Sequence, residues 1–413
     1  MNGNVFDELK ARGFIAQVSN EEAVRKMLGQ GPVTFYIGYD CTAASLHAGS
    51  LVPIMAMAHL RKAGHRAIAL IGAGTTMVGD PSGKTEMRPM LSEETIRGFG
   101  VSIQAQLDRY LNFDGQGALV LNNADWLLEL NYVGFLRDVG RHFSVNRMLA
   151  AEAYKMRMEK GLSFIEFNYQ LLQAYDFLHL FRTEKCTLQM GGDDQWGNIL
   201  AGVDLIRRVA GAEVEAMTFP LLTTSGGAKM GKTAQGAVWL DADLCSPYDF
   251  YQYWVDCDDR DVGRFLRVYT FVPLDEIARL EKLAGSEINE AKRVLAFEAT
   301  KLLHGEAAAL EARAAAGAAF GAAAGKDLQS LPTTAFPREK LEAGVPAAEL
   351  FTLVGLTASR GEAKRMIQQG GLYVNDERIA SIERLLTAAD LGPDGMILKA
   401  GKKKIHRIVP ETA

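Results

Sequence analysis

The stretch Thr34–Leu51 constrains the fold of this chain more than any other. Its first residues, Thr34–Ile37, are aromatic and β-branched and predict a strand. A turn of small residues follows, and from Leu46 to Gly64 apolar residues recur at helical spacing. The next apolar run, Ala67–Ile71, is typical of a buried strand. A strand, a helix and a strand at this spacing predict a βαβ crossover, and therefore an α/β fold with a doubly wound parallel sheet of the Rossmann-like kind.

The start of the predicted helix has the features of an anion site. Pro53 has no amide hydrogen and is tolerated only in the first turn of a helix, so His47–Ser50 is expected at or next to the open N-terminal end. Unpaired amides and the helix dipole favour an anion there. Gly49 leaves space for a flat group such as a nucleotide base to lie against the backbone. This geometry predicts a nucleotide site.

Two glycine-rich motifs further along have the wrong spacing for the sites they suggest. Gly72 and Gly74 would begin a dinucleotide fingerprint, but its third glycine position is Met77. Gly83-Lys84-Thr85 would end a P-loop, but its leading glycine position is Val78. The spacing therefore excludes both hydride transfer and a P-loop site.

A helix predicted over 163–181 opens with a capping box and carries one polar stripe. Tyr169, Gln173 and Asp176 lie on the same face, and the other positions are almost all apolar. Such a stripe points either into a binding site or into a polar network of the core, and the helix alone favours neither. Gly191–Gln195 follows another predicted strand, 186–190, where open α/β sheets bind ligands.

Composition sets the broad class. The 413 residues are 48% hydrophobic, which indicates a globular protein with room for two or three domains, and no apolar run is long enough to span a bilayer. The start of the chain lacks the apolar core of an export signal, and the four cysteines are scattered without CxxC spacing. We expect a reducing compartment, the cytoplasm, with no membrane and no protein-bound metal.

The organisation of the chain follows from these segments. We expect a catalytic α/β domain over 1–222 with an inserted helical connector at about 126–160, a glycine-rich loop with paired lysines and a link over 223–246, a helical domain over 247–327, a linker over 328–345 and a small module over 346–413. The net charge is −5, but residues 347–413 carry ten Lys or Arg against eight Asp or Glu. Local charge of this kind fits nucleic-acid contact.

These motifs together resemble those of class I aminoacyl-tRNA synthetases, most closely the bacterial tyrosyl-tRNA synthetases. SLHAGSL at 45–51 looks like their HIGH signature, and KMGKT at 229–233 looks like their KMSKS loop. The more specific matches are YIGYDCTAASLHAGSL (36–51), GDPSGK (79–84), NYQLLQAYDF (168–177) and QMGGDDQWGNI (189–199). The segment 346–413 resembles an S4 RNA-binding domain. The match runs over nearly the whole chain.

The resemblance implies a ligase that uses ATP, with magnesium and no tightly bound cofactor, to join L-tyrosine to tRNA(Tyr) through a tyrosyl-adenylate, releasing pyrophosphate and then AMP. It assigns the substrate phenol to Tyr36 and Asp176, the α-ammonium to Asp80, Tyr169 and Gln173, and the carboxylate to Gln195. It assigns the nucleotide to Gly38, Asp40, Gly49, Gly192 and Asp194. It assigns the triphosphate to Thr42, His47 and Ser50, and the departing pyrophosphate to Lys84, Arg88, Lys229 and Lys232. It assigns RNA contact to Arg360, Lys364, Arg365, Lys402, Lys403 and Lys404.

Two departures from the family pattern and two alternatives accompany this interpretation. Ser50 replaces the second histidine of HIGH, and Gly231-Lys232-Thr233 replaces Ser-Lys-Ser, which keeps both lysines. A tryptophanyl-tRNA synthetase is the alternative within the class, disfavoured because Tyr36 and Asp176 suit a phenol hydroxyl. A non-catalytic RNA-binding protein on a synthetase scaffold is the other. We also expect a homodimer formed through 126–160.

Overall fold

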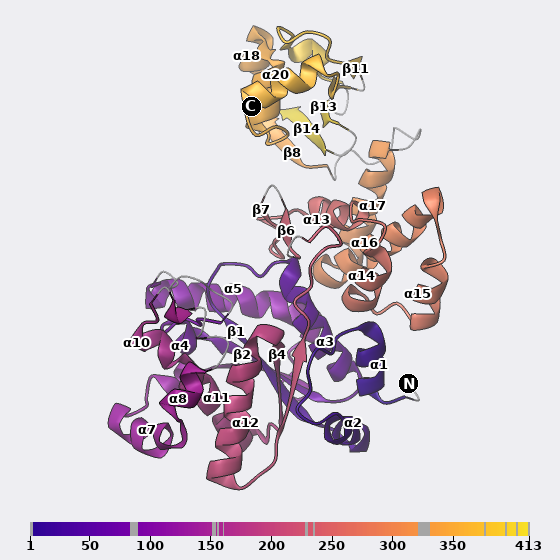
Figure 1. Ribbon diagram of the computed structural model, residues 1–413. Helices are drawn as coiled ribbons and strands as arrows, with labels where there is room; N and C mark the ends of the chain where they lie inside the picture. The colour runs from indigo at the N-terminus through magenta and orange to yellow at the C-terminus, as the bar shows by residue number, and fades with distance from the viewer. Residues whose placement is uncertain are drawn as a thin grey trace. The chain divides into compact units, whose positions relative to one another are not determined.

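The computed structural model describes residues 3–82, 90–150, 154, 157–159, 161–227, 230–233, 236–320, 331–375, 377–392, 395–401 and 404–411 (Figure 1). The chain divides into two compact units: Met1–Cys245 with Tyr253–Leu303, and Ser246–Gln252 with His304–Ala413. Each unit has a five-stranded sheet of its own.

The first unit contains a parallel sheet in the order β3-β2-β1-β4-β5. Its strands are β1 (Thr34–Asp40), β2 (Arg66–Gly72), β3 (Ala118–Asn122), β4 (Leu188–Gly192) and β5 (Glu215–Phe219). This order confirms the predicted doubly wound fold, and the direction of winding reverses between β1 and β4. β1 is three residues longer than predicted because Gly38 does not end it: Gly38 pairs with Leu70 in the ladder to β2.

Helices cover both faces of this sheet, as a parallel sheet requires. On one face α3 (Leu51–Lys62) and α5 (Glu93–Leu111) pack on each other and on β2. On the other, α11 (Tyr169–Glu184) and α12 (Trp196–Ala210) lie side by side and share a core with Tyr36, Ile68 and Leu70 of the sheet (Figure 1). The helix predicted from residue 47 begins instead with a 3-10 turn, η1 (Ala48–Ser50), and Pro53 then lies in the first turn of α3.

Helices and two short strands make up the rest of the first unit. The capping box of Ser163 and Glu166 is confirmed, but it opens a separate turn, α10, and α11 begins after Asn168. The expected connector at 126–160 is helical where it is described. The elements are α1 (Val5–Arg12), α2 (Glu21–Gln30), α4 (Ala73–Thr76), α6 (Ala124–Leu127), α7 (Tyr132–Asp138), η2 (Gly140–His142), α8 (Val145–Leu149), α10 (Phe164–Phe167), η3 (Asp193–Gln195), β6 (Lys232–Thr233), β7 (Gly236–Ala237), α14 (Val262–Tyr269), α15 (Leu274–Leu280), η4 (Gly285–Glu287) and α16 (Ile288–His304).

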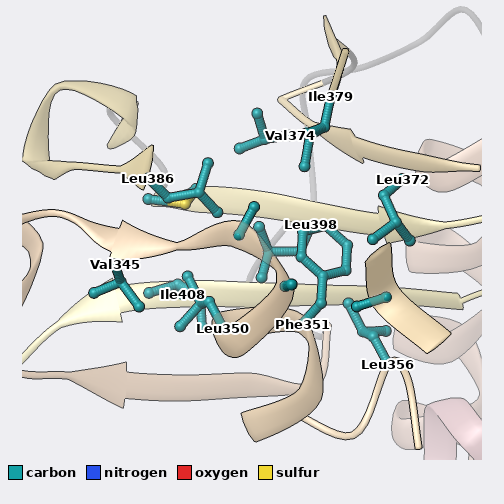
Figure 2. Close-up of a cluster of buried hydrophobic side chains, with 14 of the residues drawn as sticks. Val345, Leu350, Phe351, Leu356, Leu372, Val374, Ile379, Leu386, Leu398 and Ile408 are labelled. Carbon is teal, nitrogen blue, oxygen red and sulfur yellow. The ribbon is translucent and has the colours of Figure 1, made fainter. Parts of the chain in front are cut away.

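The second unit is built on a sheet in the order β11-β10-β13-β14-β8. Its elements are α17 (Glu306–Phe320), β8 (Thr333–Phe336), α18 (Arg338–Ala343), β9 (Val345–Pro346), α19 (Ala347–Leu353), α20 (Arg360–Gln368), β10 (Leu372–Val374), β11 (Glu377–Arg378), β12 (Leu385–Leu386), η6 (Ala388–Asp390), β13 (Met396–Ala400) and β14 (Lys404–Pro410). Helix α13 (Pro247–Val255) contributes residues to both units. Figure 2 shows the core of the second unit, where Leu350 and Phe351 of α19 meet Leu398 and Ile408 of the sheet.

The stretch 328–345, which the sequence predicts to be a linker, is folded where it is described. β8 pairs in parallel with β14, from Thr333 opposite Arg407 to Phe336 opposite Pro410, and α18 follows it. Its few hydrophobic residues include Phe336 and Leu341, which are buried in the core of the second unit. These residues therefore belong to the C-terminal module rather than to a linker. Across the described ranges, no helix is both long enough and apolar enough to cross a bilayer.

Candidate active site

A cavity of about 230 Å³ opens at the carboxyl ends of β1 and β4, the point at which open α/β sheets bind ligands. Three neighbouring strands and helix α11 supply most of its wall, and polar side chains from the loops complete it. The lining residues are Tyr36, Ile37, Gly38, Tyr39, Asp40, Ser50, Pro53, Leu70, Gly72, Thr75, Asp80, Asn123, Tyr169, Gln173, Asp176, Gln189, Met190, Gly191, Gly192 and Gln195.

Asp176 is a buried carboxylate held in the cavity wall by two hydrogen bonds. Asn123 Nδ2 donates to Oδ2 at 3.0 Å and Trp126 Nε1 donates to Oδ1 at 2.8 Å, so the carboxylate has a fixed orientation. Burial raises the pKa of Asp176 to about 7, against the effect of these two bonds. Because each bond engages one oxygen, each oxygen keeps capacity to accept another hydrogen bond.

Two further carboxylates line the cavity, each with donors of its own. Tyr169 Oη donates to Asp40 Oδ2 at 3.0 Å, and Thr75 Oγ1 donates to Asp40 Oδ1 at 2.9 Å. Gln195 Nε2 donates to Asp80 Oδ2 at 2.7 Å. Burial, followed by the charges of Asp40 and Asp80, raises the pKa of Tyr169 well above its usual value. Three carboxylates around one small cavity create a negative potential that favours a cationic group such as an ammonium.

Some buried side-chain atoms of the cavity wall have no partner in the part of the chain that the structure describes. Tyr36 Oη, Gln173 Oε1 and Gln189 Oε1 have no hydrogen-bond partner among the described residues, and all three residues line the cavity. A buried polar atom without a partner costs about 1–3 kcal/mol. A ligand that offers matching donors and acceptors would therefore gain from all three positions.

Glycines shape the side of the cavity predicted to hold the nucleotide. A Cβ at Gly72 would lie 2.4 Å from Asp40 Oδ1, and a Cβ at Gly192 would lie 2.6 Å from Asp194 Oδ1. Any larger residue would displace one of these carboxylates. Burial, followed by the charge of Asp80, raises the pKa of Asp194. Asp193 has a structural role, since its Oδ1 accepts hydrogen bonds from Gln17 and Thr218.

The two signature-like segments lie against each other. A Cβ at Gly49 would lie 2.6 Å from the carbonyl oxygen of Met230, so only glycine permits this approach. His47 Nδ1 accepts a hydrogen bond from the Gly49 amide at 3.0 Å and caps the 3-10 turn before α3. Residues 238–240 pair with 46–48 through backbone hydrogen bonds. The HIGH-like and KMSKS-like segments, which are distant in the sequence, thus meet in space at the start of α3.

Most of the predicted site residues converge on this cavity. Those that line it are Tyr36, Gly38, Asp40, Ser50, Asp80, Tyr169, Gln173, Asp176, Gly192 and Gln195. Thr42, His47, Gly49 and Asp194 lie outside its lining; Gly49 is in η1 and Asp194 is in η3. Lys84, Arg88, Lys229, Lys402 and Lys403 lie outside the described residues, and only the backbone of Lys232, in β6, is described.

The sequence patterns assign no role to the polar lining residues Thr75, Asn123 and Gln189, or to Trp126, which donates to Asp176. Asn123 directly follows β3, so the rule that ligands bind at carboxyl strand ends could have identified it. Trp126 and Gln189 offer no comparable signal, because their contribution depends on tertiary contacts. His179 stacks on Trp126 with the ring centroids 4.2 Å apart, which holds the indole in place.

In the second unit, three of the six basic residues predicted to contact RNA lie on one helix, α20. Arg360, Lys364 and Arg365 are exposed on α20, and Arg360 also forms an ion pair with Glu349 at 2.9 Å. Lys404 at the start of β14 donates to the carbonyl oxygen of Leu356 at 3.3 Å. Because Arg360 and Lys364 are four residues apart, they share one helix face.

Comparison with known proteins agrees with this geometry. Residues 28–321 match the family described as tRNA synthetases class I (W and Y), and the chain belongs to this family. Residues 327–408 match the family described as the tyrosine--tRNA ligase SYY-like C-terminal domain.

Named relatives are similar over nearly the whole chain. The tyrosine--tRNA ligase of Desulfosudis oleivorans is 54% identical, over 98% of this chain and 99% of the relative. That of Clostridium botulinum (strain 657 / Type Ba4) is 53% identical over 99% and 100%. Among solved structures, a C-terminally truncated mitochondrial tyrosyl-tRNA synthetase of Aspergillus nidulans superposes with a TM-score of 0.69 at 29% identity, covering 76% of this chain and 93% of that one.

Proposed function

We propose that this chain is a tyrosine–tRNA ligase, which joins L-tyrosine to tRNA(Tyr) in two ATP-dependent steps through a tyrosyl-adenylate. The observation that carries the proposal is a pair of groups in one cavity wall: the oriented Asp176 carboxylate, and the Tyr36 hydroxyl, which has no hydrogen-bond partner among the described residues. A phenol hydroxyl can donate to the first and accept from the second. Phenylalanine can do neither and would leave both groups buried without a ligand partner, and tyrosyl-tRNA synthetases are the standard example of such discrimination.

The remaining polar groups of the cavity suit the amino-acid backbone of the substrate. We assign the α-ammonium to Asp80, Tyr169 and Gln173, because an ammonium supplies three donors and these side chains supply acceptor oxygens. Gln195 would lie beside the substrate carboxylate. Its amide nitrogen already donates to Asp80, so one side chain connects the ammonium site to the carboxylate site.

The nucleotide would occupy the adjoining side, between the two glycine-rich segments. Gly38, Asp40, Gly49, Gly192 and Asp194 are the residues that we assign to it, with Asp194 accepting from a ribose hydroxyl. The tyrosine carboxylate would then attack the α-phosphate in line, so the protein needs no covalent nucleophile. Catalysis would come from positioning the two substrates and from stabilising the developing negative charge.

The charge-stabilising groups would come from the residues just before α3 and from the sequence segments around Lys84 and Lys229. We assign Thr42, His47 and Ser50 to the triphosphate, because two hydroxyls and an imidazole N–H are side-chain donors that suit phosphate oxygens. We assign the departing pyrophosphate to Lys84, Arg88, Lys229 and Lys232. Magnesium would enter with ATP, since Mg²⁺ is usually held by substrate phosphates and water together with few protein groups.

In the second step, a ribose hydroxyl of tRNA would attack the adenylate carbonyl. We propose that the helical domain and six basic residues bind the tRNA, because positive charges suit a phosphate backbone. These residues are Arg360, Lys364, Arg365, Lys402, Lys403 and Lys404. The tRNA substrate and the scattered cysteines favour the cytoplasm as the place where the protein works.

The chain would act as a homodimer formed through the connector and the residues next to it. Large apolar side chains there are exposed, with 72% of Val133 and 71% of Phe164 accessible to solvent. Leu128, Tyr132, Leu136, Val145 and Met158 are exposed in the same stretch of sequence. Exposed apolar residues in such number favour a protein interface.

The proposal is tested by charging tRNA with radiolabelled tyrosine or tryptophan in the presence of ATP. We expect tyrosine alone to be attached. Attachment of tryptophan would favour the sister synthetase, and tRNA binding without any charging would favour a non-catalytic RNA-binding protein.

A further inference from the structure

The KMSKS-like loop is fixed at its C-terminal stem by the HIGH-like segment. The Ala48 amide donates to the Val238 carbonyl at 2.8 Å, and the Leu240 amide donates to the Leu46 carbonyl at 2.9 Å. The Asp241 amide donates to Ser45 Oγ at 3.1 Å just beyond this pairing. These hydrogen bonds fix the path of residues 238–241. They do not involve Met230 and Gly231, which form the tip of the loop.

The tip, Met230-Gly231, approaches the start of α3 through its backbone. Gly231 has φ +75°, and a Cβ there would lie 2.6 Å from the amide nitrogen of Gly49. The contact with Gly49 is therefore one of glycine backbone against glycine backbone, and the Met230 side chain is buried. The tip also makes two backbone bonds to its own loop, from Val238 N to Gly231 O at 2.8 Å and from Met230 N to Leu222 O at 3.2 Å.

One side chain from the helical part of the first unit reaches this tip. The Gly231 amide donates to Tyr253 Oη at 3.4 Å, and Tyr253 Oη lies 3.8 Å from Met230 Sδ, to which it can donate. Tyr253 belongs to the last turns of α13, where its ring packs edge-on against Trp254 with the centroids 4.9 Å apart. Burial raises the pKa of Tyr253 to about 12, so the hydroxyl is protonated at neutral pH and can both accept and donate.

We propose that Tyr253 is a positioning residue, whose hydroxyl holds the Met230-Gly231 tip against the start of α3. Lys229 and Lys232 flank this tip in the sequence, so the position of the tip sets where both lysines can act. The proposal rests on the proposed function for its effect on rate, but the contact with Gly231 stands on the structure alone. The role of Tyr253 is indirect, because Tyr253 contacts the tip of the loop.

The test compares Tyr253→Phe with a matched control, Tyr269→Phe. The first variant keeps the aromatic ring and removes only the hydroxyl that contacts the tip. Tyr269 is a buried tyrosine of the same unit whose hydroxyl has no hydrogen-bond partner among the described residues. Removal of the Tyr269 hydroxyl should leave the loop unaffected.

Two measurements are made on the full-length chain: amide hydrogen exchange of the peptide that contains Gly231, and tyrosine-dependent ATP–pyrophosphate exchange. In Tyr253→Phe we expect exchange at Gly231 to rise and kcat to fall, each about three- to tenfold, the range for one neutral hydrogen bond. The KM for tyrosine should not change. The control should match the wild type in both measurements.

The outcomes separate this proposal from the proposed function. If Tyr253→Phe keeps wild-type amide exchange or wild-type kcat, or if Tyr269→Phe changes both to the same extent, Tyr253 does not position the loop. If the wild type shows no tyrosine-dependent pyrophosphate exchange, the proposed function fails. The amide exchange would then still decide whether Tyr253 holds the tip.

Discussion

Replacing Asp176 by asparagine should remove a pH-dependent loss of stability and weaken the hold on tyrosine. In the folded chain burial raises the pKa of Asp176 from 3.8 to about 7. The ionised carboxylate therefore disfavours the folded state at neutral pH. At 1.36 kcal/mol per pKa unit, this cost is on the order of 4 kcal/mol once the group is fully ionised.

The pH dependence follows from the sign of this shift. The folded pKa of Asp176 lies above the unfolded one. Below about pH 4 the group is protonated in both states and does not affect stability. As the pH rises from about 4 to about 7 the folded state loses stability, and the loss is complete above that range. Asparagine does not ionise, so Asp176→Asn lacks this loss. We expect its advantage over the wild type in the free energy of unfolding to be about 2–3 kcal/mol larger at pH 8 than at pH 5.

The same substitution should have the opposite effect on the substrate. A hydrogen bond to a charged group contributes about 1.5–3 kcal/mol, so kcat/KM for tyrosine should fall about ten- to hundredfold, while that for phenylalanine changes little. Urea unfolding at the two pH values and pyrophosphate exchange measure the two effects. Asp204→Asn is the control, because the pKa of Asp204 is lowered rather than raised and its loss should not stabilise the protein. Wild-type kcat/KM in Asp176→Asn, or a stability difference from the wild type that does not change between pH 5 and pH 8, would refute the reasoning.

Three other substitutions test separate parts of the molecule. Trp126→Phe removes a donor to Asp176, so the pKa of that carboxyl should rise further and the KM for tyrosine should increase severalfold at pH 7, as steady-state kinetics will show. Arg360→Ala with Lys364→Ala should raise the KM for tRNA and reduce the salt dependence of tRNA binding by roughly two phosphate contacts, with pyrophosphate exchange unchanged. Val133→Asp should shift the chain toward a monomer in analytical ultracentrifugation, because it places a charge among exposed apolar side chains.

Local sequence patterns predicted the parts of the fold that depend on local rules. The βαβ unit follows from the spacing of apolar residues, and the capping box at Ser163 follows from side chains three residues apart. The placement of Asp80, Tyr169 and Asp176 around one cavity was an expectation from the family resemblance. The structure explains how they can act together: all three line the cavity at the carboxyl ends of β1 and β4, where the winding of the sheet reverses.

Features that depend on distant partners were not predictable in this way. β8 was taken for linker because Thr333–Phe336 has little apolar pattern, and it is a strand through its pairing with β14, some seventy residues further along the chain. Trp126 belongs to the site only because its indole reaches Asp176. Tyr253 gains its contact with the loop in the same way, from another part of the fold.

The central claim is that the cavity selects tyrosine and activates it with ATP. ATP–pyrophosphate exchange measured with tyrosine, phenylalanine and tryptophan in turn tests this most directly. The account predicts exchange with tyrosine, and kcat/KM for phenylalanine and tryptophan lower by orders of magnitude. Exchange with tryptophan at a comparable rate, or no exchange with any of the three, would contradict it.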